Sequence, residues 1–446
     1  MMLNKFGQLL IKVLKNPHKA LGKLYGYFLI SYYLPSDIFR VILRCFRNRT
    51  QILLFVENYQ GWIRMRYVHK YFRDVLKYEV IVFVAPLQDS RLKWPLQKKC
   101  DEIVANIISE GVLPASGVKN NKCVRIEKFM PDVIFLANPY DCLRNSIYSS
   151  AWLSKFSDIA HITYGYTLSN TPISSCDIDF FDYCMRIYND STYMMEEFVK
   201  NRGKDWANER CLLSGQPQIE AFYDQNCAVS NYWPRQDQKG IKKVIIAPHH
   251  TIKNNVHKGD FAEGYSSFLE FRNTYLKLPE LFPNIDFVIR YHPLMLFQLK
   301  EFNAMTQEEI KEFLDQFKSF PNADIDEDFP DYIAAFKSAD VLITDGVSFL
   351  AEFLTSTKPI IQTQRQGKPE FNAFGKKITE CNYMVYTEKE LIDNITKLVI
   401  QDEDPLYDER IKVVNDNIFF PKGGIGKFIG EDIKRFLTNK NGYRCG

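Results

Sequence analysis

The stretch SADVLITDGVSFLAEFLTSTKPII, residues 338–361, carries the clearest fold signal in this sequence. A short β-branched run from Val341 to Thr344 predicts a buried strand, residues 346–355 have the pattern of a helix, and Pro359 to Gln362 predict a second strand. A strand, a helix and a strand in succession are typical of a parallel crossover unit. The unit therefore predicts an α/β fold with a parallel sheet.

The same alternation continues over the chain beyond residue 50. A polar stretch without periodicity, residues 225–241, contains Pro234 and Gly240 and is expected to separate two domains. We predict two doubly wound Rossmann-like domains that face a cleft, over residues 49–228 and 240–446. The expected strands are 52–56, 80–84, 133–136, 159–164, 183–188, 244–247, 286–291, 341–344, 359–362 and 383–386. The expected helices are 61–76, 146–155, 191–201, 263–278, 297–318, 330–337, 346–355, 387–400 and 426–438.

The composition indicates a globular protein in a reducing compartment. Of 446 residues, 46% are hydrophobic and 25% charged, which excludes collagen-like and broadly disordered chains. The ten cysteines include no C-x-x-C pair, so neither a zinc ribbon nor a disulfide framework is expected. The apolar uncharged stretch near the start of the chain, residues 24–36, is shorter than the roughly 18 residues that span a bilayer, and no signal peptide pattern is present. A cytoplasmic location, or one on the inner membrane face, is expected.

Residues 1–48 form a basic amphipathic segment. The first 50 residues hold nine Lys and Arg against one acid, Asp37, with apolar residues interleaved. This pattern predicts helices that lie on an anionic membrane, so that the protein would be peripheral. Two alternatives remain open, namely binding of single-stranded nucleic acid and simple packing on the body of the protein with the charges solvated.

Three expected strands of the second group end in polar residues. Because parallel strands present their carboxyl ends at one edge of a sheet, these residues are expected to lie together. Among them, His249, His250 and His292 are three of only seven histidines, and imidazole either takes a proton from a hydroxyl or stabilises a phosphate. A structural histidine is the plain alternative at each position. The three polar groups are APHHT (247–251), RYHP (290–293) and TDGVS (344–348).

The turn before the helix at 346–355 has the features of a phosphate seat. It is expected to present backbone N–H groups, a helix end and the Ser348 hydroxyl. Asp345 is expected to cap the helix or to accept a hydrogen bond from an acceptor hydroxyl. The alternative is an ordinary helix cap without a ligand.

The sequence does not favour a metal site or a cofactor site. Adjacent histidines rarely bind one ion, so we expect no metal at His249, His250, His257 and Asp260. The Walker, dinucleotide-binding and nucleophile-elbow motifs are missing from the sequence, which disfavours a Walker NTPase and a classical dinucleotide-binding fold. No cofactor is expected. A cationic loop suited to a diphosphate is instead predicted at Lys253, His257 and Lys258.

Four stretches of the second half resemble a known family. They are residues 338–361, FVIRYHPL (287–294) and, more loosely, APHHTI (247–252) and FPKGGIGKFIGEDI (420–433). They resemble the CDP-glycerol glycerophosphotransferases of teichoic-acid and capsule synthesis, which have a GT-B-like fold. The likeness covers roughly residues 210–435 and is weak in the first half.

The resemblance implies a nucleotide-diphosphate site in the second domain and an acceptor side in the first. The residues that fall at the family's spacing are Thr344, Asp345, Ser348, Glu352, Phe353, Lys358 and Pro359. Together with the strand ends, the expected donor-binding residues are His249, Thr251, Arg290, Thr344, Asp345, Ser348 and Glu352.

The catalytic base departs from the family pattern. Family members carry a Trp-His-Gly-Thr type segment in the first half, and its counterpart here, HITYGY (161–166), has Tyr164 at the histidine position. A tyrosine of pKa about 10 is a poor base at neutral pH. Either His161 or a second-half histidine takes the role, or the donor chemistry differs. The expected catalytic residues are His250, His292 and His161.

The implied activity is transfer of glycerol- or ribitol-phosphate from a CDP-activated donor to a cell-surface polysaccharide or lipid-linked acceptor. One alternative is a glycosyltransferase that uses a UDP- or CMP-sugar in capsule or O-antigen synthesis. The other is a non-catalytic member that binds glycan or acts as a scaffold. The expected partners are the nucleotide donor, the acceptor and an anionic membrane, with no nucleic acid.

Overall fold

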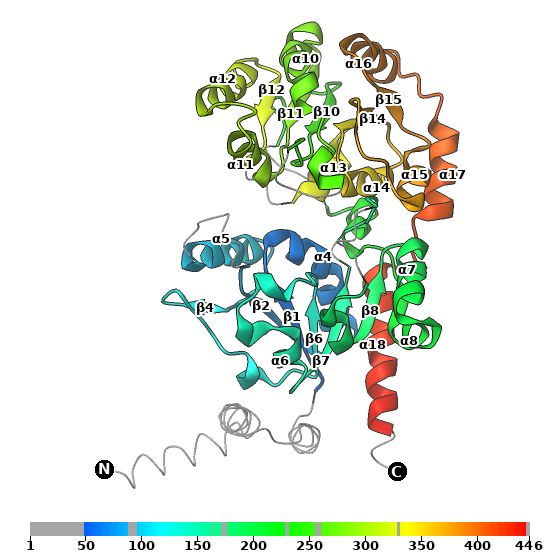
Figure 1. The fold of residues 1–446 in the computed structure, drawn as a ribbon. Helices are drawn as coiled ribbons and strands as arrows, with labels where there is room; N and C mark the ends of the chain where they lie inside the picture. The colour runs from blue at the N-terminus through cyan, green and yellow to red at the C-terminus, as the bar shows by residue number, and fades with distance from the viewer. Residues whose placement is uncertain are drawn as a thin grey trace.

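The computed structural model describes residues 49–87, 96–163, 165–170, 176–227, 232–254, 260–327 and 331–442. Over these residues the chain forms two α/β domains, each with one parallel sheet flanked by helices (Figure 1). The basic segment 1–48, Tyr164, His257 and Lys258 lie outside the described residues. The α/β fold of two Rossmann-like domains predicted from the sequence is confirmed.

The first domain contains a seven-stranded sheet of order β3-β2-β1-β6-β7-β8-β9. Its interior strand β1 (Gln51–Val56, QILLFV) is buried along its whole length, as expected of a parallel sheet covered on both faces. The other strands are β2 (Glu79–Val84), β3 (Ala115–Ser116), β6 (Val133–Leu136), β7 (Asp158–Ile162), β8 (Cys184–Asn189) and β9 (Cys211–Leu213), with a separate hairpin of β4 (Val118–Lys119) and β5 (Lys122–Cys123). The helices are α4 (Tyr59–Lys70), α5 (Leu96–Ser109), α6 (Ser150–Leu153), α7 (Thr192–Arg202) and α8 (Lys204–Arg210).

The second domain contains a six-stranded parallel sheet of order β12-β11-β10-β13-β14-β15. The central pair is in register with Ala247 beside Thr344, so both strands end at the same level. The strands are β10 (Lys242–Ala247), β11 (Ile285–Ile289), β12 (Ala323–Ile325), β13 (Val341–Thr344), β14 (Ile360–Thr363) and β15 (Tyr383–Val385). The helices are α9 (Asp260–Glu263), α10 (Phe268–Leu281), α11 (Pro293–Glu301), α12 (Gln307–Lys318), α13 (Tyr332–Ser338), α14 (Ser348–Leu354), α15 (Ala373–Thr379), α16 (Glu388–Ile395), α17 (Tyr407–Asn417) and α18 (Ile425–Gly442).

All ten expected strands are present, but the expected helices 146–155, 263–278 and 297–318 are each interrupted. The range 297–318 divides into α11 and α12. The division follows from Asn303, which has a positive φ of 52°, and from Thr306, which caps α12 through a reciprocal capping box with Glu309. The strands that the sequence did not predict, β3, β4, β5, β9 and β12, are only two or three residues long.

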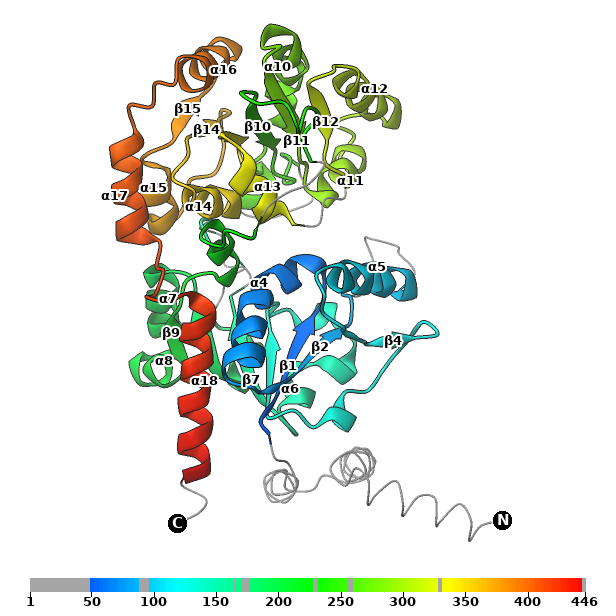
Figure 2. The same cartoon turned by 180° about the vertical axis from the view of Figure 1, so that it is seen from behind.

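The last helix, α18, returns to the first domain, where it lies beside α4 and the sheet (Figures 1 and 2). The Tyr188 hydroxyl of β8 donates to Asp432 at 2.9 Å, and Arg186 pairs with the same carboxylate at 3.0 Å. Gly430 allows the close approach, because a Cβ there would lie 2.3 Å from the ring of Tyr71. The range 240–446 therefore includes a helix that packs on the first domain.

The two domains meet at the carboxyl ends of their strands. The loop after β7 and the loop after β14 form an isolated bridge between Ser169 and Phe371. The Asn372 amide donates to the carbonyl groups of Thr167 and Ser169 at 2.8 and 3.1 Å. These contacts join the edges of the two sheets at which ligands bind in doubly wound folds.

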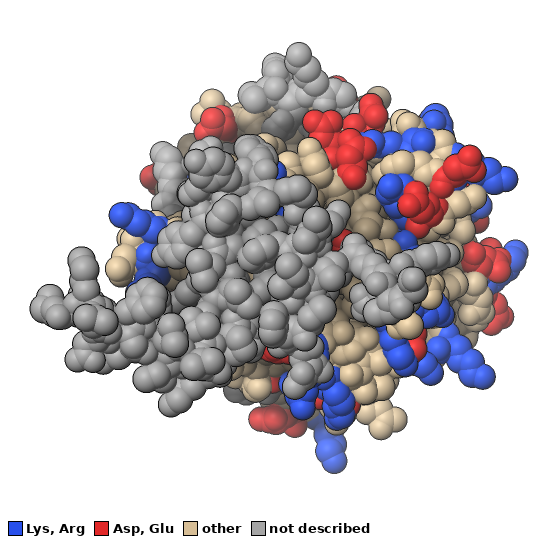
Figure 3. Space-filling view, turned by 90° about the horizontal axis from the view of Figure 1, so that it is seen from below, with Lys and Arg blue, Asp and Glu red and all other residues tan. Residues whose placement is uncertain are grey.

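No helix in the described part of the chain is long and apolar enough to cross a membrane. On the face seen from below in Figure 3, the visible basic and acidic side chains of described residues are interspersed.

Candidate functional site

Three imidazole rings meet at the carboxyl edge of the second sheet. His249 and His250 follow β10 and His292 follows β11, which is the neighbouring parallel strand. The ring centroids of His250 and His292 are 4.2 Å apart and the rings stack, while those of His249 and His250 are 4.5 Å apart. We call these three residues the histidine cluster. The structure thus brings together the histidines that the sequence placed at the strand ends.

Hydrogen bonds fix the tautomers of two of the three rings. His292 is the N-cap of α11, and its Nδ1 accepts the N–H of Leu294 at 3.1 Å. His249 Nδ1 accepts the N–H of Thr251 at 3.3 Å, so it carries no proton, and the Thr251 hydroxyl at 2.6 Å donates to the same nitrogen. Both rings, by this assignment, carry their proton on Nε2. Burial and nearby His292 lower the pKa of His249 to about 3, which keeps it neutral.

Asp345 holds the loop that carries the histidine cluster. It is fully buried, and its Oδ1 accepts the N–H of His249 at 2.5 Å. Its Oδ2 accepts the N–H of Ser267 at 2.5 Å and the Ser267 hydroxyl at 2.9 Å. Asp345 makes no cap on α14, whose N-cap is Val347. Burial raises the pKa of Asp345, and nearby Lys368 opposes that rise.

Thr344 and Ser348 flank the turn after β13. The Thr344 hydroxyl donates to the Ala247 carbonyl at 2.6 Å and accepts the N–H of Gly346 at 2.9 Å, which ties the turn to β10. Ser348 faces the first domain, because a Cβ placed on Gly165 would lie 3.7 Å from that of Ser348. The predicted phosphate turn and the HITYGY segment are thus opposite each other.

Arg290 and Glu352 are engaged within the protein. The Arg290 guanidinium pairs with buried Asp326 and lies 5.6 Å over the ring of Tyr332. Glu352 is 1% exposed on α14, and burial raises its pKa against the opposing effect of Arg64 from the first domain. Both side chains therefore bind protein groups in this conformation.

His161 does not join the histidine cluster. Its side chain is 2% exposed in β7, its Nδ1 lies 2.9 Å from the Leu136 carbonyl, and its ring packs edge-on against Phe180 and Phe181. Burial lowers the pKa of His161 to about 3. Its place in the alternating pattern of β7 turns the ring into the apolar core, so it has the environment of a structural residue.

Lys368 is a cation at the site that sequence reasoning missed. It follows β14, its Nζ donates to the Thr363 carbonyl at 3.3 Å, and its charge interacts with both Asp345 and His249. Burial lowers the pKa of Lys368 to about 8. The sequence does contain an indication of this role, because Lys368 follows an expected strand of the same sheet by only a few residues.

The predicted cationic loop is described only in part. Lys253 forms an exposed ion pair with Glu263 at 3.0 Å. Within the described residues, no group of three His, Cys, Asp or Glu side chains is arranged to hold a metal ion.

Comparison with known proteins gives a likeness of structure and none of sequence. No family profile matches the chain, and no curated protein matches it. Among solved structures, the wall teichoic acid polymerase TagF soaked with CDPG has a TM-score of 0.57 at 15% identity, covering 98% of this chain and 99% of that one. The likeness thus extends over nearly the whole of both chains.

Two nucleotide-sugar proteins are similar over a smaller share of the chain. The S. aureus MnaA-UDP structure has a TM-score of 0.54 at 13% identity and covers 87% of this chain and 97% of that one. The UDP-GlcNAc 2-epimerase from Neisseria meningitidis bound to UDP-GlcNAc has a TM-score of 0.54 at 11% identity, over 86% of this chain and 100% of that one. These likenesses show the fold, which is of the two-domain GT-B type.

Proposed function

We propose that this chain is a transferase that moves a polyol phosphate, glycerol or ribitol phosphate, from a CDP-activated donor to a polysaccharide or lipid-linked acceptor. The observation that carries the proposal is the histidine cluster at the carboxyl edge of the second sheet. The turn at Ser348 follows a strand of the same sheet, and a Cβ built on Gly165 of the first domain would lie 3.7 Å from it. The near-complete overlap with a polymerase soaked with CDPG supports this choice of donor.

The proposed reaction is an in-line displacement at phosphorus. The acceptor hydroxyl forms a bond to the phosphorus that carries the polyol, the bond from that phosphorus to the CMP oxygen breaks, and CMP leaves with the electron pair. Positioning and charge stabilisation supply most of the catalysis in such a transfer.

Each member of the cluster has a distinct proposed role. His292 and His249, which carry protons on Nε2, donate hydrogen bonds to phosphate oxygens. His250, which lies against both rings, takes the proton of the attacking hydroxyl. Lys368 and Ser348 add positive charge and a hydroxyl donor near the diphosphate. Arg290, Thr251, Thr344 and Glu352 shape the site through their contacts with the protein.

Three further parts of the proposal come from the sequence. The second domain binds the donor and the first domain binds the acceptor. The protein acts at the inner face of the membrane, held there by residues 1–48. No metal and no cofactor enter the scheme.

A second candidate is a protein that acts on a UDP-sugar. The observation in its favour is the fold shared with MnaA-UDP and with the epimerase bound to UDP-GlcNAc, at a TM-score of 0.54 each. Both candidates use the same edge of the second sheet, so the histidine cluster alone does not separate them.

Product analysis separates the two candidates. The full chain is incubated with CDP-glycerol, CDP-ribitol or UDP-GlcNAc together with a polyol-phosphate primer, and the released nucleotide is identified by chromatography. Release of CMP with lengthening of the primer is expected. Turnover of the UDP-sugar alone would replace the proposal with the second candidate, and absence of turnover with every donor would favour a non-catalytic binding protein.

A further inference from the structure

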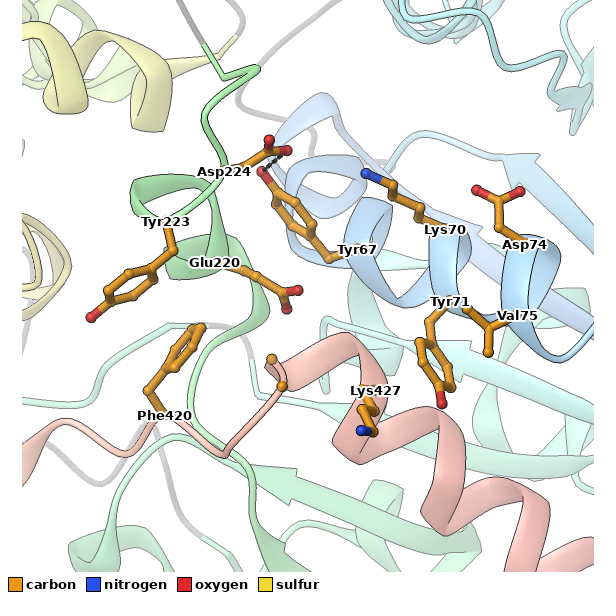
Figure 4. Close-up of a pocket in the computed structure, with 12 residues that line it drawn as sticks. Tyr67, Lys70, Tyr71, Asp74, Val75, Glu220, Tyr223, Asp224, Phe420 and Lys427 are labelled. Atoms are coloured by element: carbon orange, nitrogen blue, oxygen red, sulfur yellow. Dashed lines mark hydrogen bonds between the residues drawn. The ribbon is translucent and has the colours of Figure 1, made fainter.

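A pocket of about 430 Å³ lies where the chain passes between the two domains (Figure 4). Its walls are α4 and the π-helical turn η1 (Tyr71–Val75) of the first domain, the 3-10 helix η8 (Pro217–Phe222) with the residues just after it, and residues 420–427 at the start of α18. None of its lining residues belongs to the histidine cluster. Its volume is within the range of ordinary small-molecule sites.

The three carboxylates in the pocket already have partners. Asp74 pairs with the neighbouring arginine at 2.6 Å. Glu220 accepts the N–H of Gly426 at 2.9 Å and so caps α18. Asp224 accepts the hydroxyl proton of Tyr67 at 3.3 Å, the bond drawn in Figure 4, and this hydrogen bond and nearby Lys70 contribute to its lowered pKa. The acidic groups are therefore neutralised or hydrogen-bonded by the protein itself.

The two lysines of the pocket, unlike its carboxylates, have no close hydrogen-bond or ion-pair partner among the described residues. Lys70 of α4 and Lys427 of α18 stand on different walls (Figure 4). Within the described residues, neither ammonium group has a hydrogen bond or an ion pair within 4 Å, although the charge of Lys70 acts on Glu220 and Asp224 at longer range. Two ammonium groups on separate walls of one pocket are suited to an anionic group placed between them.

Apolar side chains line the pocket at two places, Tyr223 with Phe420 at one end and Val75 at the other (Figure 4). Tyr223 is 55% exposed, and its ring centroid lies 4.4 Å from that of Phe420. Val75, at the end of the π-helical turn, is 57% exposed. Exposed aromatic faces bind the carbon skeleton of a ligand, and π-helical turns occur frequently at functional sites.

Glycine keeps the floor of the pocket open. Gly424 has a φ of 97°, and a Cβ there would lie 2.5 Å from the Glu220 carboxylate. A side chain at this position would displace the cap of α18, and a Cβ on the neighbouring Gly423 would lie 3.0 Å from the side chain of Lys427.

We propose that this pocket binds a polyol-phosphate unit of the acceptor chain, outside the catalytic cleft. The phosphate lies between Lys70 and Lys427, and the carbon backbone lies against Tyr223 and Phe420. The identity of the ligand rests on the proposed function, whereas the anionic character rests on the two lysines.

Binding is tested on the full chain by titration calorimetry with a short poly(glycerol phosphate). The double variant Lys70→Gln with Lys427→Gln is expected to bind about tenfold more weakly or worse, since two charge-assisted hydrogen bonds are lost. The matched control is Lys200→Gln with Lys412→Gln, which removes the same charge from α7 and α17. Equal affinity of the two double variants would overturn the proposal.

Two further measurements separate the sources of binding. Tyr223→Ala is expected to weaken binding of the polymer but not of inorganic phosphate. Equal weakening of both ligands, or of neither, would contradict the proposed contact between the polyol and Tyr223. The His250→Ala variant is expected to keep the pocket affinity. If the proposed function is wrong, the parent chain releases no CMP. If the proposed pocket is wrong, CMP release is normal and only the calorimetric affinities contradict the proposal.

Discussion

The imidazole rings of His250 and His292 stack with their centroids 4.2 Å apart. They meet because β10 and β11 are adjacent parallel strands whose paired residues include Ile246 and Ile289, so the two chains end at the same level of the sheet. The α11 cap formed by His292 fixes its ring orientation.

Removal of either imidazole is expected to abolish most turnover. The single variants His250→Ala and His292→Ala should lose on the order of 100-fold or more in CMP release, which is the usual contribution of an acid–base group. Their melting temperatures should stay within a few degrees of the parent, because both rings lie on the partly exposed edge of the sheet. Near-normal rates in both variants would contradict their assignment to catalysis.

Asp345 is expected to act through the position of the histidine loop. In Asp345→Asn an amide N–H₂ replaces one acceptor oxygen and opposes the N–H of His249 or Ser267, which should cost about 2 kcal/mol of unfolding free energy. Displacement of the loop should lower kcat by on the order of 10-fold to 100-fold, with a smaller change in KM.

The control for Asp345 is Asp286→Asn. Asp286 is equally buried and pairs with Arg235 at 2.6 Å, but it lies near the start of β11 and away from the histidine cluster. It should lose stability and keep kcat. An equal fall of kcat in both variants would show a general effect of unfolding.

His161 is expected to control stability at acid pH and not turnover. Its pKa is lowered to about 3 in the folded chain from 6.5, so between these values the unfolded chain binds the extra proton and stability falls as pH falls. This one group is expected to make the free energy of unfolding about 2 kcal/mol lower at pH 5 than at pH 7. In His161→Gln, denaturant unfolding at pH 7 and pH 5 should show a correspondingly smaller difference. Loss of catalysis in a folded His161→Gln protein would contradict the structural role and support a catalytic one.

Gly430 is expected to be required for the packing of α18. In Gly430→Ala the new Cβ would lie 2.3 Å from the ring of Tyr71, and such overpacking typically costs about 1 to 3 kcal/mol. Gly61→Ala in α4 is the matched control, since its Cβ would meet only Asn58 at 3.4 Å and alanine favours the helix. The midpoint of urea unfolding measures both, and equal midpoints would contradict the close helix contact.

Residues 1–48 are expected to hold the protein on anionic membranes. Deletion of this segment should release the protein from anionic vesicles in a sedimentation assay and leave activity on a soluble acceptor largely unchanged. Salt should weaken binding of the full chain, because surface attraction is screened. A truncated protein that still sediments with vesicles would place the membrane contact elsewhere.

Local pattern was enough to predict the strands and the polar groups at their ends. Runs such as Val341 to Thr344 are apolar and β-branched because both faces of a parallel strand are buried, and this property is visible in a few consecutive residues. Parallel order then places His249, His292 and Thr344 at one edge without further information. The sequence by itself thus determined the fold class and the membership of the histidine cluster.

Tertiary packing decided what each polar residue does. The sequence near His161 does not show that Phe180 and Phe181 enclose it, and nothing near Asp345 shows that the distant Ser267 donates to it. Such contacts depend on which loops meet when the sheets and helices pack, and they join residues far apart in the chain. For the same reason, only the structure could show that α18 returns to the first domain. The need for glycine at Gly430 becomes visible only when the ring of Tyr71 is seen to pack against it.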